Sequence, residues 1–205
     1  MLVRHEIFGH RTVDVPLISG ASPLDPDEAA DLIPDHIATV SQLNEWEATN
    51  IFHAEAWAFD RRHTDVTTED FVKALHHKMF DQTWRWAGRY RNTEKNLGSP
   101  PHLIPMEVRD ACANAGYWRA NKVFALTELA VRFHHRIVAV HPFPNGNGRH
   151  ARLLADVALF SMGEDRLTWG RTSLQQAGST RSEYIAALRA ADAGDFKPLL
   201  RFSRS

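Results

Sequence analysis

Mostly apolar residues recur at steps of three and four along most of this chain. This is the spacing of one face of an α-helix. Between residues 41 and 61 these positions are Leu43, Trp46, Asn50, Ile51, Ala54 and Trp57. A second, strongly apolar series consists of Leu126, Leu129, Ala130, Phe133, Ile137 and Val140. The first series predicts an amphipathic helix over 41–61, and the second predicts a helix that runs up to His141.

Further helices are predicted by start signals and by composition. Residues 67–70, Thr-Thr-Glu-Asp, form a capped start, and residues 180–183, Thr-Arg-Ser-Glu, form a capping-box pattern. Another helix is expected over 105–121. Residues 152–160 are apolar on nearly every side, which is typical of a helix in the middle of a bundle.

The first 38 residues differ from this pattern and are interpreted as an N-terminal arm. Residues 20–27 are rich in turn formers and should hold little regular structure, with a short helix following from Pro26. Only residues 89–104 favour extended structure, for which we expect a small β-hairpin. The predicted fold class is therefore all-α, a helical bundle with one β excursion.

Composition narrows the class of protein. The chain has 205 residues, of which 43% are hydrophobic, and a formal net charge of -1. This balance excludes an extended disordered chain and offers no net positive field for nonspecific nucleic-acid binding. A single cysteine, Cys112, excludes an internal disulfide. Since residues 1–15 hold no signal-peptide core and no run of about 18 apolar residues exists, we expect a soluble, cytoplasmic protein.

The segment 141–152 is not explained by packing alone. It connects the two most apolar helices, where a plain connector would need only a few residues. Its Gly-Asn-Gly run leads into a helix start, where backbone N–H groups and the helix dipole favour an anion such as phosphate. Arg149 and Arg152 are three residues apart and lie on one face of that helix. His141 stands at the other end of the loop and should titrate near neutrality unless its surroundings shift it.

A base, an anion cradle and two arginines are the groups that phosphoryl or nucleotidyl transfer requires. Phe143 is interpreted as the apolar residue that anchors the loop to the core. No Gly-Lys-Ser/Thr ends the loop, which excludes a Walker motif. The competing interpretation is a turn-rich linker whose arginines are incidental.

Other histidines and arginines near this loop are weighed as well. The chain has 12 histidines but no His-Glu-x-x-His pattern, which disfavours a metal cluster. His134 and His135 are interpreted as packed or solvated helix residues. His150 should point away from the two arginines and stay uncommitted, and Arg171 is considered as a group that approaches the cleft.

The string His-Pro-Phe-Pro-Asn-Gly-Asn-Gly-Arg-His-Ala-Arg at 141–152 resembles the signature of Fic-domain proteins, His-x-Phe-x-Asp/Glu-Gly-Asn-Gly-Arg-x-x-Arg. Residues 84–91, Trp-Arg-Trp-Ala-Gly-Arg-Tyr-Arg, resemble the family's segment before its substrate-docking flap, and 184–202 resemble its closing helices. The resemblance implies a Fic-type helical bundle over 39–205 with a small β-hairpin flap.

Fic enzymes usually transfer AMP from ATP to a Ser, Thr or Tyr hydroxyl of a target protein. Residues 20–26 and 43–47 resemble a branch of the family called mobile mystery protein B, found on bacterial mobile elements. That branch implies a small helix-turn-helix partner protein encoded nearby. The resemblance thus implies ATP as co-substrate and a protein as target, with no direct role for nucleic acid or membrane.

By this resemblance His141 is the general base, which takes the hydroxyl proton as the oxygen attacks the α-phosphate. Gly146, Asn147 and Gly148 form the anion cradle, and the Asn147 side chain also contacts phosphate. The resemblance therefore assigns base catalysis and phosphate binding to the same loop.

The resemblance also assigns roles to the arginines and the flap. Arg149 holds the β-phosphate of the departing pyrophosphate, and Arg152 holds the γ-phosphate or an inhibitory glutamate. The flap, about 92–101, pins the target peptide by β-augmentation. Lys95 is a candidate for steering nucleotide or target, against the alternative of a plain exposed lysine. Tyr184 is a candidate for the nucleotide-base pocket, against a core or surface tyrosine.

Asn145 departs from the family pattern, which has Asp or Glu as a magnesium ligand at this position. An amide oxygen can ligate Mg²⁺ or Mn²⁺, but it brings no negative charge to a cation that prefers carboxylate and phosphate oxygens. We therefore expect weaker metal dependence, a changed metal preference, or chemistry other than AMP transfer.

Many Fic proteins carry an inhibitory helix with the pattern Ser/Thr-x-x-x-Glu-Gly/Asn, whose glutamate pairs with the second arginine. Ser41 to Glu45 supplies the first half of that pattern, but Trp46 follows where Gly or Asn is usual. Glu47 lies in the same helix turn. The predicted helix over 41–61 is thus a candidate inhibitory helix, against the alternative that its glutamates face solvent.

These observations favour a protein adenylyltransferase of the Fic type. The same loop could instead serve a phosphotransferase, a de-AMPylase or a nucleotide hydrolase. A non-enzymatic alternative is a catalytically weak nucleotide-binding partner protein, because Asn145 replaces the acidic ligand. The intact His141 and Arg149 favour an enzyme over that alternative.

Overall fold

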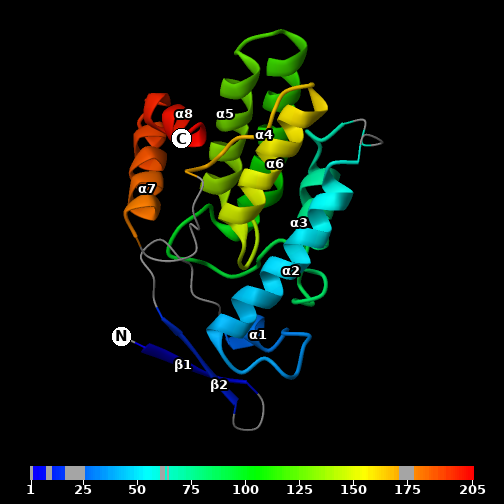
Figure 1. The fold of residues 1–205 in the computed structure, drawn as a ribbon, viewed down its shortest axis with the longest axis vertical. Coiled ribbons are helices and arrows are strands. Elements are labelled where there is room, and N and C mark those ends of the chain that lie inside the picture. Colours follow the sequence, from blue (N-terminus) through cyan, green and yellow to red (C-terminus); the bar gives the residue numbers. More distant parts are fainter. Residues whose placement is uncertain (1, 8–10, 17–25, 61–62, 64, 171–177) are drawn as a thin grey trace.

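A computed structural model describes the whole chain except residues 1, 8–10, 17–25, 61–62, 64 and 171–177. Its elements, in chain order, are β1 (Leu2–Ile7), β2 (Arg11–Pro16), α1 (Pro26–Ala29), α2 (Val40–Ala58), α3 (Glu69–Phe80), the 3₁₀ turn η1 (Pro101–Leu103), α4 (Ile104–Ala120), α5 (Leu126–Val140), α6 (Asn147–Ser161), α7 (Ser179–Asp192) and α8 (Lys197–Ser203). Figure 1 shows the helices gathered into one bundle, with the two strands beyond its lower end. Within the described part of the chain, no helix is long and apolar enough to cross a membrane.

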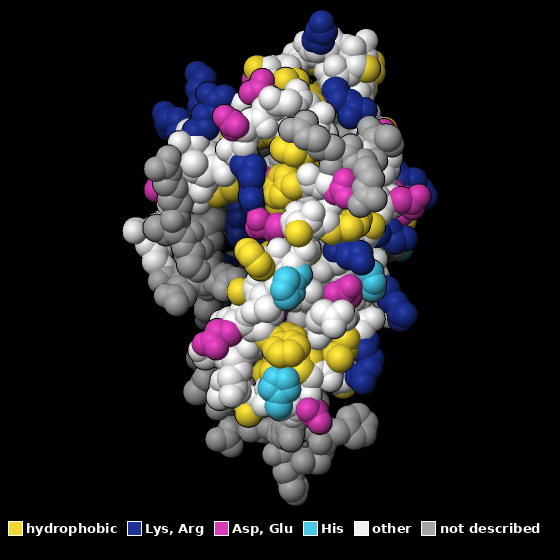
Figure 2. Space-filling view, turned by 45° about the vertical axis from the view of Figure 1, so that its right-hand side comes forward, with side chains coloured by type: hydrophobic (Ala, Val, Ile, Leu, Met, Phe, Trp, Pro, Cys, Tyr) yellow, Lys and Arg dark blue, Asp and Glu magenta, His cyan; other side chains and the backbone are white. Residues whose placement is uncertain are grey.

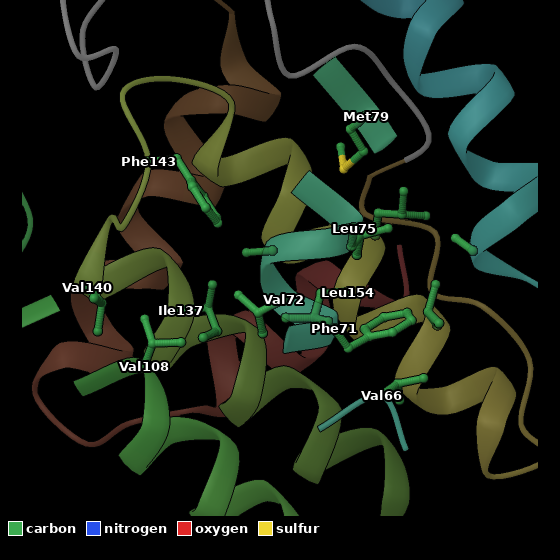
Figure 3. Packing of buried hydrophobic residues seen from close by; sticks show 14 of the residues in the cluster. Val66, Phe71, Val72, Leu75, Met79, Val108, Ile137, Val140, Phe143 and Leu154 are labelled. Carbon is green, nitrogen blue, oxygen red and sulfur yellow. The ribbon is translucent and has the colours of Figure 1, made fainter. Parts of the chain in front are cut away.

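The bundle is built around α5 and α6, which pack against each other, with α4 and α8 on α5, α3 on α6, and α2 on α3. One apolar cluster joins them to α3 and α4 and contains fully buried Leu75, Val108, Ile137 and Leu154 (Figure 3). A second cluster joins their other side to α7 and α8. The apolar character of residues 152–160 is explained by this position, because α6 is covered from both sides.

Most predicted helices are confirmed, and their starts show why. Thr39 caps α2 with a full capping box that includes Gln42, and the side chain of Thr68 caps α3. The capping box predicted at 180–183 is wrong: α7 begins after Gly178 without a side-chain cap, and the Ser182 hydroxyl donates to the Gly178 carbonyl at 3.1 Å.

The β-hairpin expected within 89–104 is also wrong, since none of these described residues lies in a strand. The backbone there pairs with the chemistry-bearing loop instead of with itself. Arg91 N–H donates to the Pro142 carbonyl at 2.9 Å, and Ser99 N–H donates to the Val140 carbonyl at 3.1 Å. The backbone at Arg91 and Ser99 therefore bonds to the end of α5 and to the loop that follows it.

The strands lie in the N-terminal arm. β1 and β2 pair antiparallel, with Leu2 opposite Pro16 and Ile7 opposite Arg11. The short helix predicted from Pro26 is confirmed as α1. The turn-rich segment 20–27 lies mostly outside the described residues.

Candidate functional site

The predicted loop connects the end of α5 to the start of α6 through two residues with left-handed backbone. His141 ends α5 with φ 52° and ψ 59°, and Gly146 precedes α6 with φ 77°. A Cβ at Gly146 would lie 2.4 Å from the Phe80 ring, so both the conformation and the space require glycine. Phe143 is fully buried and points into the core, as predicted (Figure 3).

The start of α6 is an open anion site. Gly146 offers no side-chain cap, and the first N–H groups of a helix have no carbonyl partner within it. The helical hydrogen bond to the Gly146 carbonyl is donated by His150 N–H, at 2.9 Å. The backbone N–H groups of Asn147, Gly148 and Arg149 are therefore placed to receive phosphate oxygens.

Asn147 braces the loop with its side chain. Its Oδ1 accepts from Phe143 N–H at 2.9 Å, its Nδ2 donates to the Phe143 carbonyl at 2.8 Å, and the residue is 2% exposed. Both ends of the amide are thus occupied inside the loop. This corrects the expectation that the Asn147 side chain contacts phosphate, while leaving its backbone N–H in the cradle.

Asn145 is held by two hydrogen bonds at the same turn. Its Oδ1 accepts from Gly146 N–H at 2.5 Å, and its carbonyl accepts from His76 Nε2 at 3.1 Å. Among the described residues, no group of three or more His, Cys, Asp or Glu side chains could hold a metal ion. One neutral oxygen that already accepts a backbone hydrogen bond is a poor match for Mg²⁺.

His76 supports the loop from α3, a role that sequence analysis missed. Its Nδ1 accepts from Gly88 N–H at 3.0 Å, so the proton must sit on Nε2, which donates to Asn145. Its ring stacks on Phe143 with centroids 3.7 Å apart. Burial lowers the pKa of His76 well below its usual value, which keeps this tautomer neutral. A polar residue beside Leu75 on the apolar face of the predicted helix was the available signal.

His150 corrects a second expectation. It points away from the arginines, as predicted, but its Nε2 donates to the Val72 carbonyl at 2.9 Å and the residue is fully buried. It is therefore committed to joining α6 to α3. The interpretation of His134 and His135 as packed helix residues is confirmed, since both are buried.

His141 carries an environment that favours the neutral imidazole. Burial, followed by the charges of Arg91 and Lys95, lowers its pKa to about 4, against an opposing hydrogen bond with the Val138 backbone. The surroundings therefore shift the ring away from titration near neutrality. A neutral ring at physiological pH is the form that can accept a proton.

Arg149 is paired with Glu47 of α2. Its Nη1 lies 2.6 Å from Glu47 Oε2, and Trp84 Nε1 donates to Glu47 Oε1 at 2.7 Å. The Glu47 residue is 3% exposed, so this carboxylate is held inside the protein. The resemblance implied a glutamate on Arg152, and the structure corrects this to Arg149.

Glu45 does not reach the site. It is exposed, and its carboxylate accepts from the Ser41 hydroxyl at 3.3 Å. Of the two candidate inhibitory glutamates, only Glu47 is brought to the loop. The solvent-facing alternative therefore applies to Glu45 alone.

Arg152 lies beside α7. Its guanidinium lies 5.4 Å from the centroid of the Tyr184 ring, and its charge acts on the Tyr184 hydroxyl. That hydroxyl lies 2.9 Å from His134 Nε2. No ion pair joins Arg152 to a carboxylate within the described residues, and its charge, after burial, lowers the pKa of Arg181.

Three further candidate site residues remain to be placed. Lys95 is not an exposed steering residue: its side chain is 2% exposed and pairs with Glu28 of α1 at 2.5 Å. Tyr184 is 6% exposed within the second apolar cluster, which fits the core alternative. Arg171 lies outside the described residues.

A broad groove beside α2 and the end of α3 is not lined by this loop. It has a volume of about 510 Å³ and is lined by Trp46, Thr49, Asn50, His53, Ala54, Trp57, Lys78, Asp81 and Gln82. On the face drawn in Figure 2, acidic and basic side chains lie side by side without a large area of one sign.

Comparison with known proteins places the loop in a family. Residues 66–159 match the Fic/DOC family. A protein adenylyltransferase of Caenorhabditis elegans is 29% identical over 146 residues, covering 69% of this chain and 27% of the relative. A probable protein adenylyltransferase of Aquifex aeolicus is 26% identical over 159 residues, covering 73% and 46%. The chain thus spans less than half the length of these relatives.

Solved structures show the same fold. An N-terminal Fic domain of a Bartonella quintana effector, with bound ADP, superposes with a TM-score of 0.64 at 15% identity, over 82% of this chain and 86% of that one. The Fic-1 protein of C. elegans gives 0.61 at 23% identity, over 86% and 50%. Residues 66–159, which carry the loop between α5 and α6, thus match the Fic/DOC family model, and the chain shares the fold of these solved Fic structures.

Proposed function

We propose that this chain is a protein adenylyltransferase, which transfers AMP from ATP to a Ser, Thr or Tyr hydroxyl of a target protein. The observation that carries the proposal is one loop with a neutral histidine at its first residue and an uncapped helix start at its other end. Relatives named protein adenylyltransferases support the same reaction.

In the proposed reaction His141 accepts the proton of the target hydroxyl as that oxygen attacks the α-phosphorus. A new P–O bond forms, the bond to the β-phosphate oxygen breaks, and pyrophosphate leaves. The N–H groups at the start of α6 and the charges of Arg149 and Arg152 stabilise the developing negative charge. No covalent bond to the enzyme is required.

A divalent cation fits the residues of this loop poorly, because Asn145 supplies one neutral oxygen. The Mg²⁺ or Mn²⁺ that accompanies ATP would be held chiefly by nucleotide phosphates and water. We therefore assign no step of the reaction to a metal ion that the protein holds.

The Glu47 carboxylate supports self-inhibition. It occupies Arg149 at 2.6 Å, where the resemblance places the β-phosphate, so nucleotide and carboxylate compete for one guanidinium. Since Glu47 lies on α2, this helix acts as the inhibitory element. Activation then consists of separating Glu47 from Arg149.

We place the target peptide at 92–101, because this segment lies directly against His141. A Cβ at Gly98 would stand 2.5 Å from the His141 Cβ, which shows how closely the two backbones approach. The small helix-turn-helix partner implied by the family branch is tested by co-purification, and its absence from the purified complex would count against it.

The test compares ATP labelled in the α-phosphate with ATP labelled in the γ-phosphate, in a bacterial lysate with Mg²⁺ or Mn²⁺. We expect α-label on protein with wild type, none with His141→Ala, and wild-type labelling with His53→Ala. His53 is an exposed histidine on α2 and serves as the matched control. Transfer of γ-label instead would show a phosphotransferase, and no protein label would overturn the proposal.

A further inference from the structure

Arg91 lies buried between the segment 92–101 and the end of α5. It is 3% exposed, and among the described residues its guanidinium donates to backbone carbonyls. Nε donates to His141 at 2.7 Å, Nη1 to Thr93 at 2.8 Å and Nη2 to Ser99 at 2.6 Å. Nη2 also lies 3.5 Å from the Val140 carbonyl. One side chain therefore joins two segments that are about fifty residues apart in the sequence.

The charge of Arg91 is met by helix carbonyls. No ion pair joins it to a carboxylate in the part of the chain that the structure describes, and Glu28 and Glu94 act on it only through longer-range attraction. The last carbonyls of a helix have no partner within the helix and carry partial negative charge, which favours a cation there. The end of α5 is thus capped by this arginine.

The same hydrogen bonds fix an unfavourable backbone conformation. His141 is one of three non-glycine residues with positive φ among those described, a region that non-glycine residues rarely occupy. Arg91 bonds to the carbonyl of His141 and reaches the carbonyl before it. The peptide groups on both sides of His141 are therefore held in place.

We propose that Arg91 is the positioning residue for the general base: it holds His141 in its left-handed conformation and ties the target-docking segment to the same point. This rests on the proposed function for the role of His141. Because the arginine contacts both elements, base orientation and target docking share one support.

The electrostatic consequence has a definite sign. Arg91 and Lys95 both face His141 and lower its pKa, as burial does, while the Val138 carbonyl raises it. Removing the Arg91 charge must therefore raise the pKa of His141. Replacement by lysine keeps the charge but loses the fork that bonds several carbonyls at once.

The experiment uses Arg91→Lys and Arg91→Gln, with Arg89→Gln as the matched control on an exposed arginine two residues away. It measures kcat and KM for ATP, and follows the His141 ring by NMR between pH 4 and 8. The His141 signal is the one missing from His141→Ala. Thermal unfolding of each variant is measured beside these.

We expect Arg91→Lys to lower kcat by about 10- to 100-fold with KM for ATP nearly unchanged, because misplacing a catalytic group affects the chemical step. Its His141 should titrate as in wild type. Arg91→Gln should lower kcat similarly and move the His141 midpoint up from about 4 toward its usual value. Arg89→Gln should match wild type in both.

Wild-type kcat in Arg91→Lys, or an unmoved His141 midpoint in Arg91→Gln, would overturn the proposal. If Arg91→Gln unfolds at assay temperature, the kcat of Arg91→Lys decides. If wild type transfers no label from ATP, the proposed function fails, and the two titrations still decide whether Arg91 controls His141.

Discussion

Arg149 and Arg152 stand three residues apart on α6, yet the protein treats their charges in opposite ways. Arg149 is neutralised by a buried carboxylate from α2, at 2.6 Å. Among the described residues, Arg152 forms no ion pair with a carboxylate, and it lies beside the Tyr184 ring with the charge of Arg181 nearby. One guanidinium already holds an anion, and the other is left to attract one.

This difference shows how one phosphate site can be closed on one side and open on the other. A carboxylate and a phosphate compete for Arg149 because both match its planar fork. Arg152 keeps its charge, so a nucleotide can still be drawn toward the loop. Under the proposed function, ATP can thus approach Arg152 while Arg149 stays occupied.

Among the variants, the largest expected effect is on stability, where Arg149→Ala and Arg152→Ala should differ. Arg149→Ala leaves the Glu47 carboxylate buried without its partner, which should lower the free energy of unfolding by about 2–3 kcal/mol. Arg152→Ala strands no charge and should lower it by about 1 kcal/mol. Urea unfolding measures both. The double variant Arg149→Ala with Glu47→Ala should recover part of the loss, and equal losses for the single variants would contradict the comparison.

A pH titration is expected to give the next effect, through the histidines behind the loop. His76, His134, His141 and His150 have lowered pKa values, about 4 for the last two, chiefly because burial disfavours their charged form. Unfolding restores ordinary values near 6.5. The stability they contribute is therefore complete above pH 6.5 and is lost as the pH falls toward 4, by up to about 1.4 kcal/mol per pH unit for each histidine.

One carboxyl opposes this trend. Burial raises the pKa of Asp156 to about 6, so its contribution improves as the pH falls from 6 toward 4. Four histidines outweigh one aspartate, and the free energy of unfolding should fall clearly between pH 6.5 and 5. A flat profile in that range would show that these rings are not buried as neutral groups.

Tyr184→Phe should have a smaller effect, confined to the open side of the site. It removes the hydroxyl that lies 2.9 Å from His134 Nε2 and on which the Arg152 charge acts, and ATP affinity should fall about fivefold, the equivalent of about 1 kcal/mol. Tyr117→Phe, at a 61% exposed tyrosine, is the control. Calorimetry of ATP binding measures both, and an unchanged affinity in Tyr184→Phe would show that Arg152 needs no support from α7.

The smallest effect is expected at Asn145, which neither arginine contacts in the described structure. Asn145→Asp restores a carboxylate oxygen, and should lower the Mg²⁺ concentration for half-maximal label transfer by about two- to fivefold. The titration is run against wild type and against Mn²⁺. If activity and metal dependence both stay unchanged, the asparagine is not the cause of any altered metal preference.

Sequence reasoning predicted the helices and the loop because both are local. Apolar spacing locates the buried face of α5, and a Gly-Asn-Gly run before a helix locates the anion site. The resemblance assigned the inhibitory glutamate to Arg152, whereas Glu47 pairs with Arg149 across 102 residues, and spacing along one helix does not say which neighbour that helix meets. The hairpin failed for the same reason, since the partner of residues 91–99 is the end of α5. Arg91 went unnoticed because nothing local marks it as buried, whereas the polar residue beside Leu75 was a signal for His76 that was missed.

The most direct test of the competition at Arg149 is label transfer from α-labelled ATP by Glu47→Gln beside Glu45→Gln and wild type. The glutamine can still accept from Trp84 but leaves the Arg149 charge unpaired. The account predicts about tenfold more label with Glu47→Gln, as expected for a difference of about 1.4 kcal/mol, and wild-type labelling with Glu45→Gln. Equal or lower labelling with Glu47→Gln, or the same rise in both variants, would contradict it.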